Sequence, residues 1–185
     1  MIELVLAVAV LVLTGAVILL YAMVGELAAR FEESVLGNSV RSFVRPLPDA
    51  PLNKSPKSWP AALTGISHAR PGALLVFSTS CMSCERLAPL LPSAIESFPI
   101  SDVALAIASP RRDLAESFVE RHGLQLVRPW IDDGGKWLRD DVGVTTSPVC
   151  LIFDVGQLTA ALSFSDFSIL GDALLKTDLL PLERR

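Results

Sequence analysis

The sequence predicts a mixed α/β fold, with one central sheet and helices on both of its faces, preceded by a single transmembrane helix. Two observations favour this fold class. Short apolar runs typical of buried strands alternate with helical segments, and a strand pair and a last helix follow. Ahead of them, 21 consecutive residues from Leu4 to Val24 carry no charge. With 185 residues, 51% of them apolar, the chain can form one packed domain and an appendage, which excludes global disorder.

The uncharged stretch predicts a membrane anchor. As a helix it is about 31 Å long at about 1.5 Å per residue, which is enough to cross a bilayer. A cleaved signal peptide is the alternative, but Met1–Glu3 provide no Lys or Arg, and no clean cleavage site follows. We therefore expect residues 1–30 to form a transmembrane anchor helix in a single-pass protein of the cell membrane. Residues 4–24 would contact the lipid bilayer.

Residues 31–60 are predicted to be a proline-rich spacer. Its second half holds five prolines, Pro46, Pro48, Pro51, Pro56 and Pro60. Prolines at this density favour a semi-extended chain, and the alternative is an irregular coil packed on the edge of the domain. The folded domain is expected to comprise residues 61–185.

Within that domain, the hydrophobic pattern and the turn residues predict the individual elements. The predicted strands are Leu74–Phe77, Val103–Ala108, a short candidate at Leu124–Val127, Val149–Phe153 and Leu158–Phe164. The predicted helices are Cys81 to about Phe98, interrupted by Pro89 and Pro92, then Arg111–His122, a short one around Trp137–Val142, and Asp166–Lys176. Gly123 suits a helix C-cap, and Asp166 suits a helix N-cap.

A Cys-x-x-Cys motif, formed by Cys81 and Cys84, follows the first predicted strand. At the start of a helix the two thiols lie on the same side of the first turn, where they can close a disulfide. The positive end of the helix favours a thiolate on Cys81. The motif therefore predicts reversible dithiol–disulfide exchange through a redox-active Cys81–Cys84 disulfide, with no bound cofactor.

Metal binding by the same pair is the alternative hypothesis. A structural zinc needs four ligands, and the remaining soft candidates are Cys150, His68 and His122. No metal is therefore expected, although a tethered binding or metal-delivery module that uses the pair as ligands stays open. Cys150 is predicted to be a buried core residue on its strand, since a free cysteine packs as a small hydrophobe.

The order of these motifs resembles the thioredoxin-like superfamily over roughly residues 60–180. The resemblance consists of a buried strand, the Cys-x-x-Cys motif, Pro89 five residues after the second cysteine, and Thr-Ser-Pro at 146–148 before a strand pair. With its anchor and spacer, the chain is similar to the membrane-anchored TlpA/ResA-like thiol–disulfide oxidoreductases. It is also similar to the thioredoxin-like protein of methylamine-utilisation maturation, which suggests an accessory maturation role.

The resemblance implies a role for each matching residue. Cys81 would be the nucleophile, Cys84 the resolving thiol, and Pro148 a cis-proline that faces the pair. The residues implied in substrate binding are Thr146, Ser147, Met82 and Ser83. Ser147 would pair through its backbone with an extended substrate segment.

The sequence departs from the family at two positions near the motif. Ser80 stands where many thioredoxins have a tryptophan. Leu75 stands where many have a buried acid that helps to deprotonate the second cysteine, so that proton transfer needs another group. A peroxiredoxin is disfavoured because its threonine and proline are replaced here by Ser78 and Leu74.

The implied partners are a cysteine-containing protein substrate and a membrane thiol-electron carrier. Arg30 and Arg41 after the anchor place the domain in the cytoplasm by the positive-inside rule alone. Disulfide traffic on proteins belongs mainly outside the cytoplasm, and we give this argument more weight, so the soluble domain is expected to be extracytoplasmic. A net charge of −4 and the absence of a basic stripe argue against nucleic acid as a partner.

Overall fold

The structure is a computed structural model of the full chain, and it describes residues 13–15, 17, 19–23 and 42–176. The chain divides into two units between Arg41 and Ser42. The described residues of the first unit are helical and exposed. Among all described residues, no helix combines the length and apolar character that crossing a membrane requires. Most of the predicted anchor at 4–24 lies outside the described residues.

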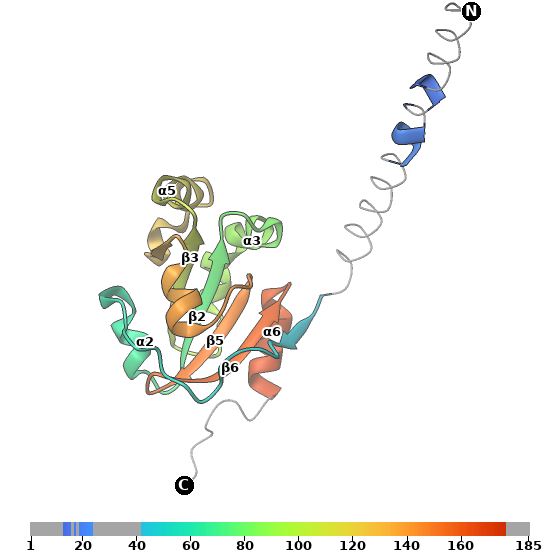
Figure 1. Cartoon of the computed structure of the whole chain (residues 1–185). Coiled ribbons are helices and arrows are strands. Elements are labelled where there is room, and N and C mark those ends of the chain that lie inside the picture. Colours follow the sequence, from blue (N-terminus) through green and yellow to red (C-terminus); the bar gives the residue numbers. More distant parts are fainter. Residues whose placement is uncertain (1–12, 16, 18, 24–41, 177–185) are drawn as a thin grey trace, which may run out of the picture. The chain divides into compact units, whose positions relative to one another are not determined.

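The second unit contains one six-stranded sheet with the strand order β1-β6-β5-β2-β3-β4 (Figure 1). The strands are β1 (Val44–Pro46), β2 (Gly72–Ser78), β3 (Asp102–Ser109), β4 (Trp130–Asp133), β5 (Val149–Asp154) and β6 (Gln157–Phe164). β2, β3 and β4 are parallel, whereas β5 is antiparallel to both β2 and β6, and β1 is antiparallel to β6. The predicted mixed sheet is confirmed.

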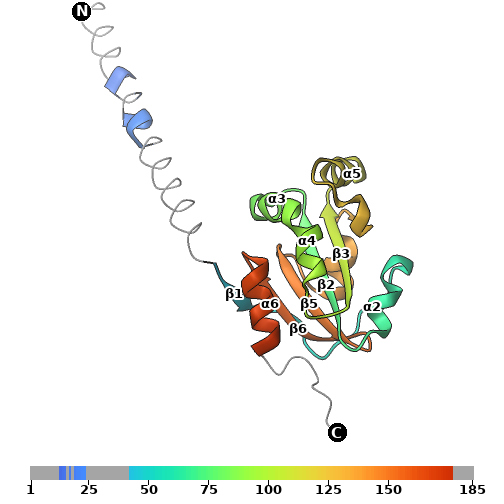
Figure 2. The same cartoon turned by 180° about the vertical axis from the view of Figure 1, so that it is seen from behind.

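Helices cover both faces of this sheet, as predicted. The helices are α2 (Thr64–His68), α3 (Met82–Leu87), α4 (Leu91–Glu96), α5 (Arg112–Arg121) and α6 (Phe167–Lys176). One face is covered by α3, α4, α5 and α6. In Figure 2, α4 and α6 lie in front of the sheet. α2 and a π-helical turn at Leu138–Val142 pack on the other face. Successive side chains of β2 point to opposite faces of the sheet and so enter two hydrophobic cores. Leu75 and Phe77 belong to the first core, under α3–α6, and Leu74 and Val76 belong to the second, on the other face.

The predicted long helix after Cys81 is divided as its prolines suggest. A 3-10 turn at Ala88–Leu90 separates α3 from α4 and contains Pro89. Asp166 caps α6 as predicted, since its Oδ1 accepts from the backbone N–H of Ser168 at 2.8 Å. The hydrogen bond from the Ser168 hydroxyl, together with those from the backbone N–H groups of Ser168 and Ile169, holds the pKa of Asp166 below its ordinary value.

The domain begins earlier than predicted, and this corrects the boundary of the spacer. The compact unit starts at Ser42, so residues 42–60 belong to it and not to a spacer. β1 pairs with β6, and the chain after it follows β6, with the Asn53 N–H donating to the Leu158 carbonyl at 2.7 Å. Trp59 then packs against Trp137, with ring centroids 5.6 Å apart. Apolar side chains between the prolines bind this segment to the second core.

The strand predicted at Leu124–Val127 is also wrong. These residues form a 3-10 turn between Gly123 and Arg128, which both have left-handed backbone conformations with φ of 65° and 50°. Leu126 consequently points outward and is 89% exposed. The strand at the edge of the sheet beside β3 is instead β4, where no strand was predicted.

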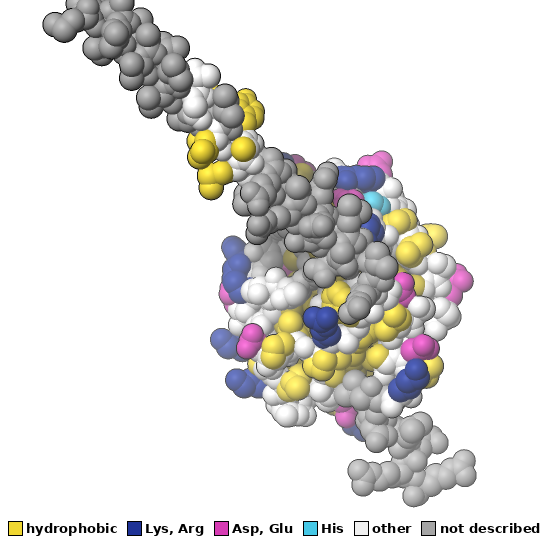
Figure 3. Space-filling view, turned by 90° about the vertical axis from the view of Figure 1, so that its right-hand side faces the viewer, with side chains coloured by type: hydrophobic (Ala, Val, Ile, Leu, Met, Phe, Trp, Pro, Cys, Tyr) yellow, Lys and Arg dark blue, Asp and Glu magenta, His cyan; other side chains and the backbone are white. Residues whose placement is uncertain are grey.

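A groove of about 490 Å³ lies between α4 and α6, and Leu90, Phe98, Phe167 and Leu175 supply its apolar lining. Figure 3 views the side of the unit that carries β1 and α6, where apolar side chains gather at the surface. This groove is separate from the Cys-x-x-Cys motif, because no residue of the motif lines it.

Candidate active site

The end of β2 positions the Cys-x-x-Cys motif. Thr79 continues the strand direction, with its N–H donating to the Ala108 carbonyl at 3.2 Å and its Oγ1 3.0 Å from Ser109 Oγ. The Cys81 N–H then donates to the Ser78 carbonyl at 3.2 Å and closes a tight turn. This turn ends the buried strand and starts α3 with Cys81 as its N-cap.

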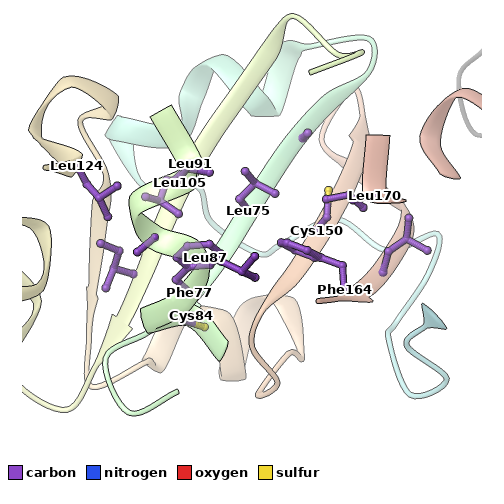
Figure 4. Packing of buried hydrophobic residues seen from close by; sticks show 14 of the residues in the cluster. Leu75, Phe77, Cys84, Leu87, Leu91, Leu105, Leu124, Cys150, Phe164 and Leu170 are labelled. Atoms are coloured by element: carbon purple, nitrogen blue, oxygen red, sulfur yellow. The ribbon is translucent and has the colours of Figure 1, made fainter. Parts of the chain in front are cut away.

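The two sulfurs have different environments. Cys81 is half-buried, whereas Cys84 is completely buried among the apolar residues of the first core, including Phe77 and Leu87 (Figure 4). Cys81 Sγ accepts a hydrogen bond from the Cys84 N–H at 3.3 Å, as an N-cap side chain does. Both are free thiols in this structure. A partner from outside therefore meets Cys81 first.

The two thiols differ in how readily they lose a proton. The hydrogen bond from the Cys84 side chain is the largest cause that lowers the pKa of Cys81, to about 5, and the Cys84 N–H adds to it against the opposing effect of burial. The same hydrogen bond and burial raise the pKa of Cys84. Near neutral pH, Cys81 is therefore a thiolate, the nucleophilic form, and Cys84 keeps its proton.

The loop before β5 faces the exposed sulfur. Cys81 Sγ lies 3.4 Å from the Ser147 carbonyl oxygen, to which its thiol form donates. The Ser147–Pro148 peptide bond is cis. Ser147 is half-buried, and Pro148 is buried. The fold thus brings Cys81 and Cys84 together with the Ser147–Pro148 pair, which begins 63 residues after Cys84 in the sequence.

The other predicted substrate-binding residues lie around this centre. Thr146 is exposed and lines a small pocket beside the loop. Met82 is 71% exposed next to the reactive cysteine. Ser83 Oγ accepts from Arg86 within α3 at 3.4 Å, so its side chain is engaged by its own helix.

Leu75 and Cys150 lie opposite each other in the β2–β5 ladder, and both are fully buried. Leu75 therefore offers no acid near Cys84. Cys150 is a core residue, as predicted, and burial raises the pKa of its thiol. Among the described residues, no three His, Cys, Asp or Glu side chains form a group that could hold a metal ion.

The sequence did not reveal an ionic cluster beside the motif. Glu85, in the first turn of α3, contacts both Arg121 and His122 at the end of α5. These residues are 36 and 37 positions apart from Glu85, so no local pattern connects them. Only the acid in the first turn of a helix is a recognisable signal.

No protein-family model matches the chain, and no curated protein matches it. Among solved structures, it is similar to a secreted Mycobacterium tuberculosis disulfide oxidoreductase homologous to E. coli DsbE. The sequence identity is 19%, the TM-score is 0.44, and the match covers 60% of this chain and 84% of that chain.

Two further structures are similar to the chain. StoA from Bacillus subtilis has 15% identity and a TM-score of 0.45, with 69% of this chain and 98% of that chain covered. A DsbF homologue from Corynebacterium diphtheriae has 15% identity and a TM-score of 0.47, with 62% and 76% covered. The likeness concerns the fold, which the strand order and helix positions of this chain establish independently.

Proposed function

We propose that the protein is a membrane-tethered thiol–disulfide oxidoreductase that exchanges disulfides with a cysteine-containing protein through Cys81 and Cys84. The unequal pair is the observation that supports this function. An accessible sulfur with a pKa of about 5 suits attack, and a buried, protonated sulfur 3 residues later suits resolution. The cis Ser147–Pro148 loop, 3.4 Å from the reactive sulfur, provides backbone beside the site of attack.

In the reducing direction, the Cys81 thiolate attacks one sulfur of the partner's disulfide. A bond forms between Cys81 Sγ and that sulfur, the partner's S–S bond breaks, and the other partner sulfur leaves as a thiolate that takes a proton from water. Cys84 then gives up its proton, through water, to the partner sulfur that leaves, and its thiolate attacks Cys81 Sγ and breaks the bond between Cys81 and the partner. The Cys81–Cys84 disulfide forms, the partner's second thiol is released, and two electrons have passed to the partner.

The reverse sequence oxidises a partner dithiol. A membrane thiol carrier would return the Cys81–Cys84 disulfide to the dithiol form, and no bound cofactor takes part. The uncharged stretch at 4–24 supports a tether in the cell membrane, with the domain on the extracytoplasmic side. Such a tethered exchanger would serve as an accessory maturation factor for a particular partner.

Trapping the partner tests this function. Cys84→Ser removes the resolving thiol, so the full-length protein in its native membrane is expected to accumulate a mixed disulfide through Cys81. A non-reducing gel should show this species, and dithiothreitol should release it. Cys81→Ser should capture nothing and should not reduce insulin disulfides.

Cys150→Ala is the matched control, because this third cysteine is buried away from solvent. It should retain exchange and should not accumulate the mixed disulfide. Insulin reduction that persists in Cys81→Ser, or the absence of any thiol-linked species in Cys84→Ser, would refute the proposed function. A reporter active only outside the cytoplasm, fused after the anchor, tests the orientation separately.

A further inference from the structure

The groove of about 490 Å³ between α4 and α6 leaves apolar side chains at the surface. Leu90, just before α4, is 55% exposed, and Leu175, in the last turn of α6, is 66% exposed. Phe98 and Phe167 add half-buried rings to the lining. Exposed apolar side chains that gather in this way mark a surface that another segment covers.

The α6 wall of the groove is lowest at Gly171. Phe167, Gly171 and Leu175 follow one another at four-residue steps and therefore lie on the same side of α6. Among the described residues, a Cβ at Gly171 would meet no heavy atom within 4 Å. Because glycine in the interior of a helix is unfavourable, this residue costs α6 stability and leaves room for a side chain from elsewhere.

The charged side chains in the lining, Asp166 and Asp172, are both acidic. Asp166 Oδ1 accepts from the Ser168 N–H, whereas Asp172 is exposed and forms no ion pair among the described residues. A segment that suits this groove therefore combines apolar side chains with a cation.

The chain itself supplies such a segment directly after α6. Residues 177–185, which lie outside the described residues, have the sequence Thr-Asp-Leu-Leu-Pro-Leu-Glu-Arg-Arg. They are apolar from Leu179 to Leu182, with one acid on each side of this run, and then carry Arg184 and Arg185. A short tether gives an effective concentration on the order of millimolar, so this segment has an advantage over a partner in solution.

The length and spacing of an extended segment also match the α6 wall. Nine extended residues reach about 30 Å, whereas the helix rises only about 12 Å between Phe167 and Leu175. Alternate side chains of an extended segment point to the same side at intervals of about 6.6 Å. Four residues of a helix rise about 6 Å. Alternate side chains of the segment can therefore meet successive positions of the wall.

We propose that residues 177–185 turn back after α6 and bind in this groove, with Leu182 over Gly171 and Arg184 beside Asp166. This proposal does not rest on the proposed function. The docked segment covers the apolar side chains of α4 and α6 and leaves the Cys-x-x-Cys motif open, because no residue of the motif lines the groove. A second copy of the chain and a separate partner are the alternative occupants.

Engineered thiols test the docking in the full-length protein. Cys81→Ser/Cys84→Ala removes the reactive pair, and Glu183→Cys with Ser93→Cys places one thiol in the segment and one on α4. Ser93 lines the groove and is exposed. Equilibration with reduced and oxidised glutathione, followed by a non-reducing gel, measures the effective concentration of the two thiols.

Glu183→Cys with Ser101→Cys is the matched pair, because Ser101 is exposed but does not line the groove. We expect the effective concentration of the Ser93 pair to be about tenfold higher than that of the Ser101 pair, which should have the value of a flexible tether. Equal effective concentrations for the two pairs would overturn the proposal.

Two glycine variants provide the second comparison. Gly171→Leu fills the centre of the groove and should lower the effective concentration of the Ser93 pair to that of the Ser101 pair. Gly65→Leu makes the same change in α2, where a Cβ would also meet no heavy atom within 4 Å, and should leave the value unchanged. Both substitutions replace a helical glycine by a better helix former, so both proteins should fold.

The outcomes separate the three occupants. An unchanged effective concentration in a folded Gly171→Leu protein would overturn the proposal. Disulfides that join two chains, seen as dimers on the gel, would overturn it in favour of a second copy. Because the variants lack Cys81 and Cys84, the result does not depend on whether the wild-type protein exchanges disulfides.

Discussion

His122 Nε2 lies 2.7 Å from Glu85 Oε2, which joins the end of α5 to the first turn of the helix that carries the reactive cysteine. Arg121 Nη1 contacts the other carboxylate oxygen at 3.1 Å. The imidazole is mostly buried and packs on Phe118, with ring centroids 4.6 Å apart. Glu85 stands one helical turn after Cys81, so two cationic or hydrogen-bonding groups engage the acid nearest in sequence to the thiolate.

This contact predicts a charge effect on the reactive thiol. In Arg121→Met/His122→Gln, the Glu85 carboxylate loses its partners and disfavours a second negative charge on Cys81. The pKa of Cys81 should rise from about 5 by roughly half a unit, as expected for a like charge in a partly solvated site. The ultraviolet absorbance of the thiolate as a function of pH measures the shift.

Arg112→Met is the matched control for this change. It breaks the Arg112–Glu116 pair, which has the same 3.1 Å separation at the other end of α5. The Cys81 titration of this variant should match that of the wild type. An unshifted titration in the double variant would show that the Glu85 contact serves only to pack α5 against α3.

A second prediction concerns the segment with which the second unit begins, residues 42–60. Trp59 packs on Trp137 and Phe153, with ring centroids 5.6 and 5.0 Å apart, and the Trp137 Nε1–H donates to the Ser58 carbonyl. Trp59→Ala should lower the free energy of unfolding by about 2 to 3 kcal/mol, which is less than the about 3 to 5 kcal/mol typical of a large aromatic in a core, because the ring is half-buried. Urea unfolding measures the loss.

The substitution Leu52→Ala tests whether the loss is specific to that packing. Leu52 lies in the same segment but is 44% exposed, and its removal should cost less than about 0.5 kcal/mol. If Trp59→Ala unfolds at the wild-type urea concentration, the packing of Trp59 on Trp137 and Phe153 does not stabilise the unit.

The sequence predicted the four central strands because β2, β3 and β5 contain continuous apolar runs, and β6 is mostly apolar, with Thr159 and Ser163 as interruptions. β4 was missed because Trp130–Asp133 includes two aspartates, and the buried one, Asp132, accepts hydrogen bonds from the backbone of the turn that begins five residues later. The Cys-x-x-Cys motif was readable because its two residues are near neighbours. The groove between α4 and α6 and the Glu85 contact depend on tertiary packing between separate elements, which no local spacing encodes.

A third prediction separates the core cysteine from the reactive pair. Cys150→Ser places a hydroxyl where the side chain is fully buried and lies opposite Leu75. The free energy of unfolding should fall by about 1 to 3 kcal/mol, because the apolar core offers the hydroxyl no hydrogen-bond partner to replace water. Cys150→Ser keeps nearly the same side-chain volume and therefore measures the cost of polarity. Cys150→Ala adds no polar group and measures the cost of the cavity. Disulfide exchange by the folded protein should be unchanged in both, and a loss of exchange would assign Cys150 to the active site.

The last prediction concerns pH. The rate at which Cys81 attacks a small disulfide follows the thiolate fraction, which rises as the pH rises through the pKa. For the wild type the rate should increase between about pH 4 and 6 and then level off, since the pKa of Cys81 is about 5. Cys84→Ala removes the hydrogen bond that contributes most to lowering this pKa, so the rise should move to higher pH by one unit or more. Stopped-flow release of thiolate from an aromatic disulfide measures both profiles.

Cys150→Ala is the control and should give the wild-type profile, because the sulfur that it removes is buried in the core. An unmoved profile in Cys84→Ala would mean that the N-terminal end of α3 alone sets the pKa of Cys81.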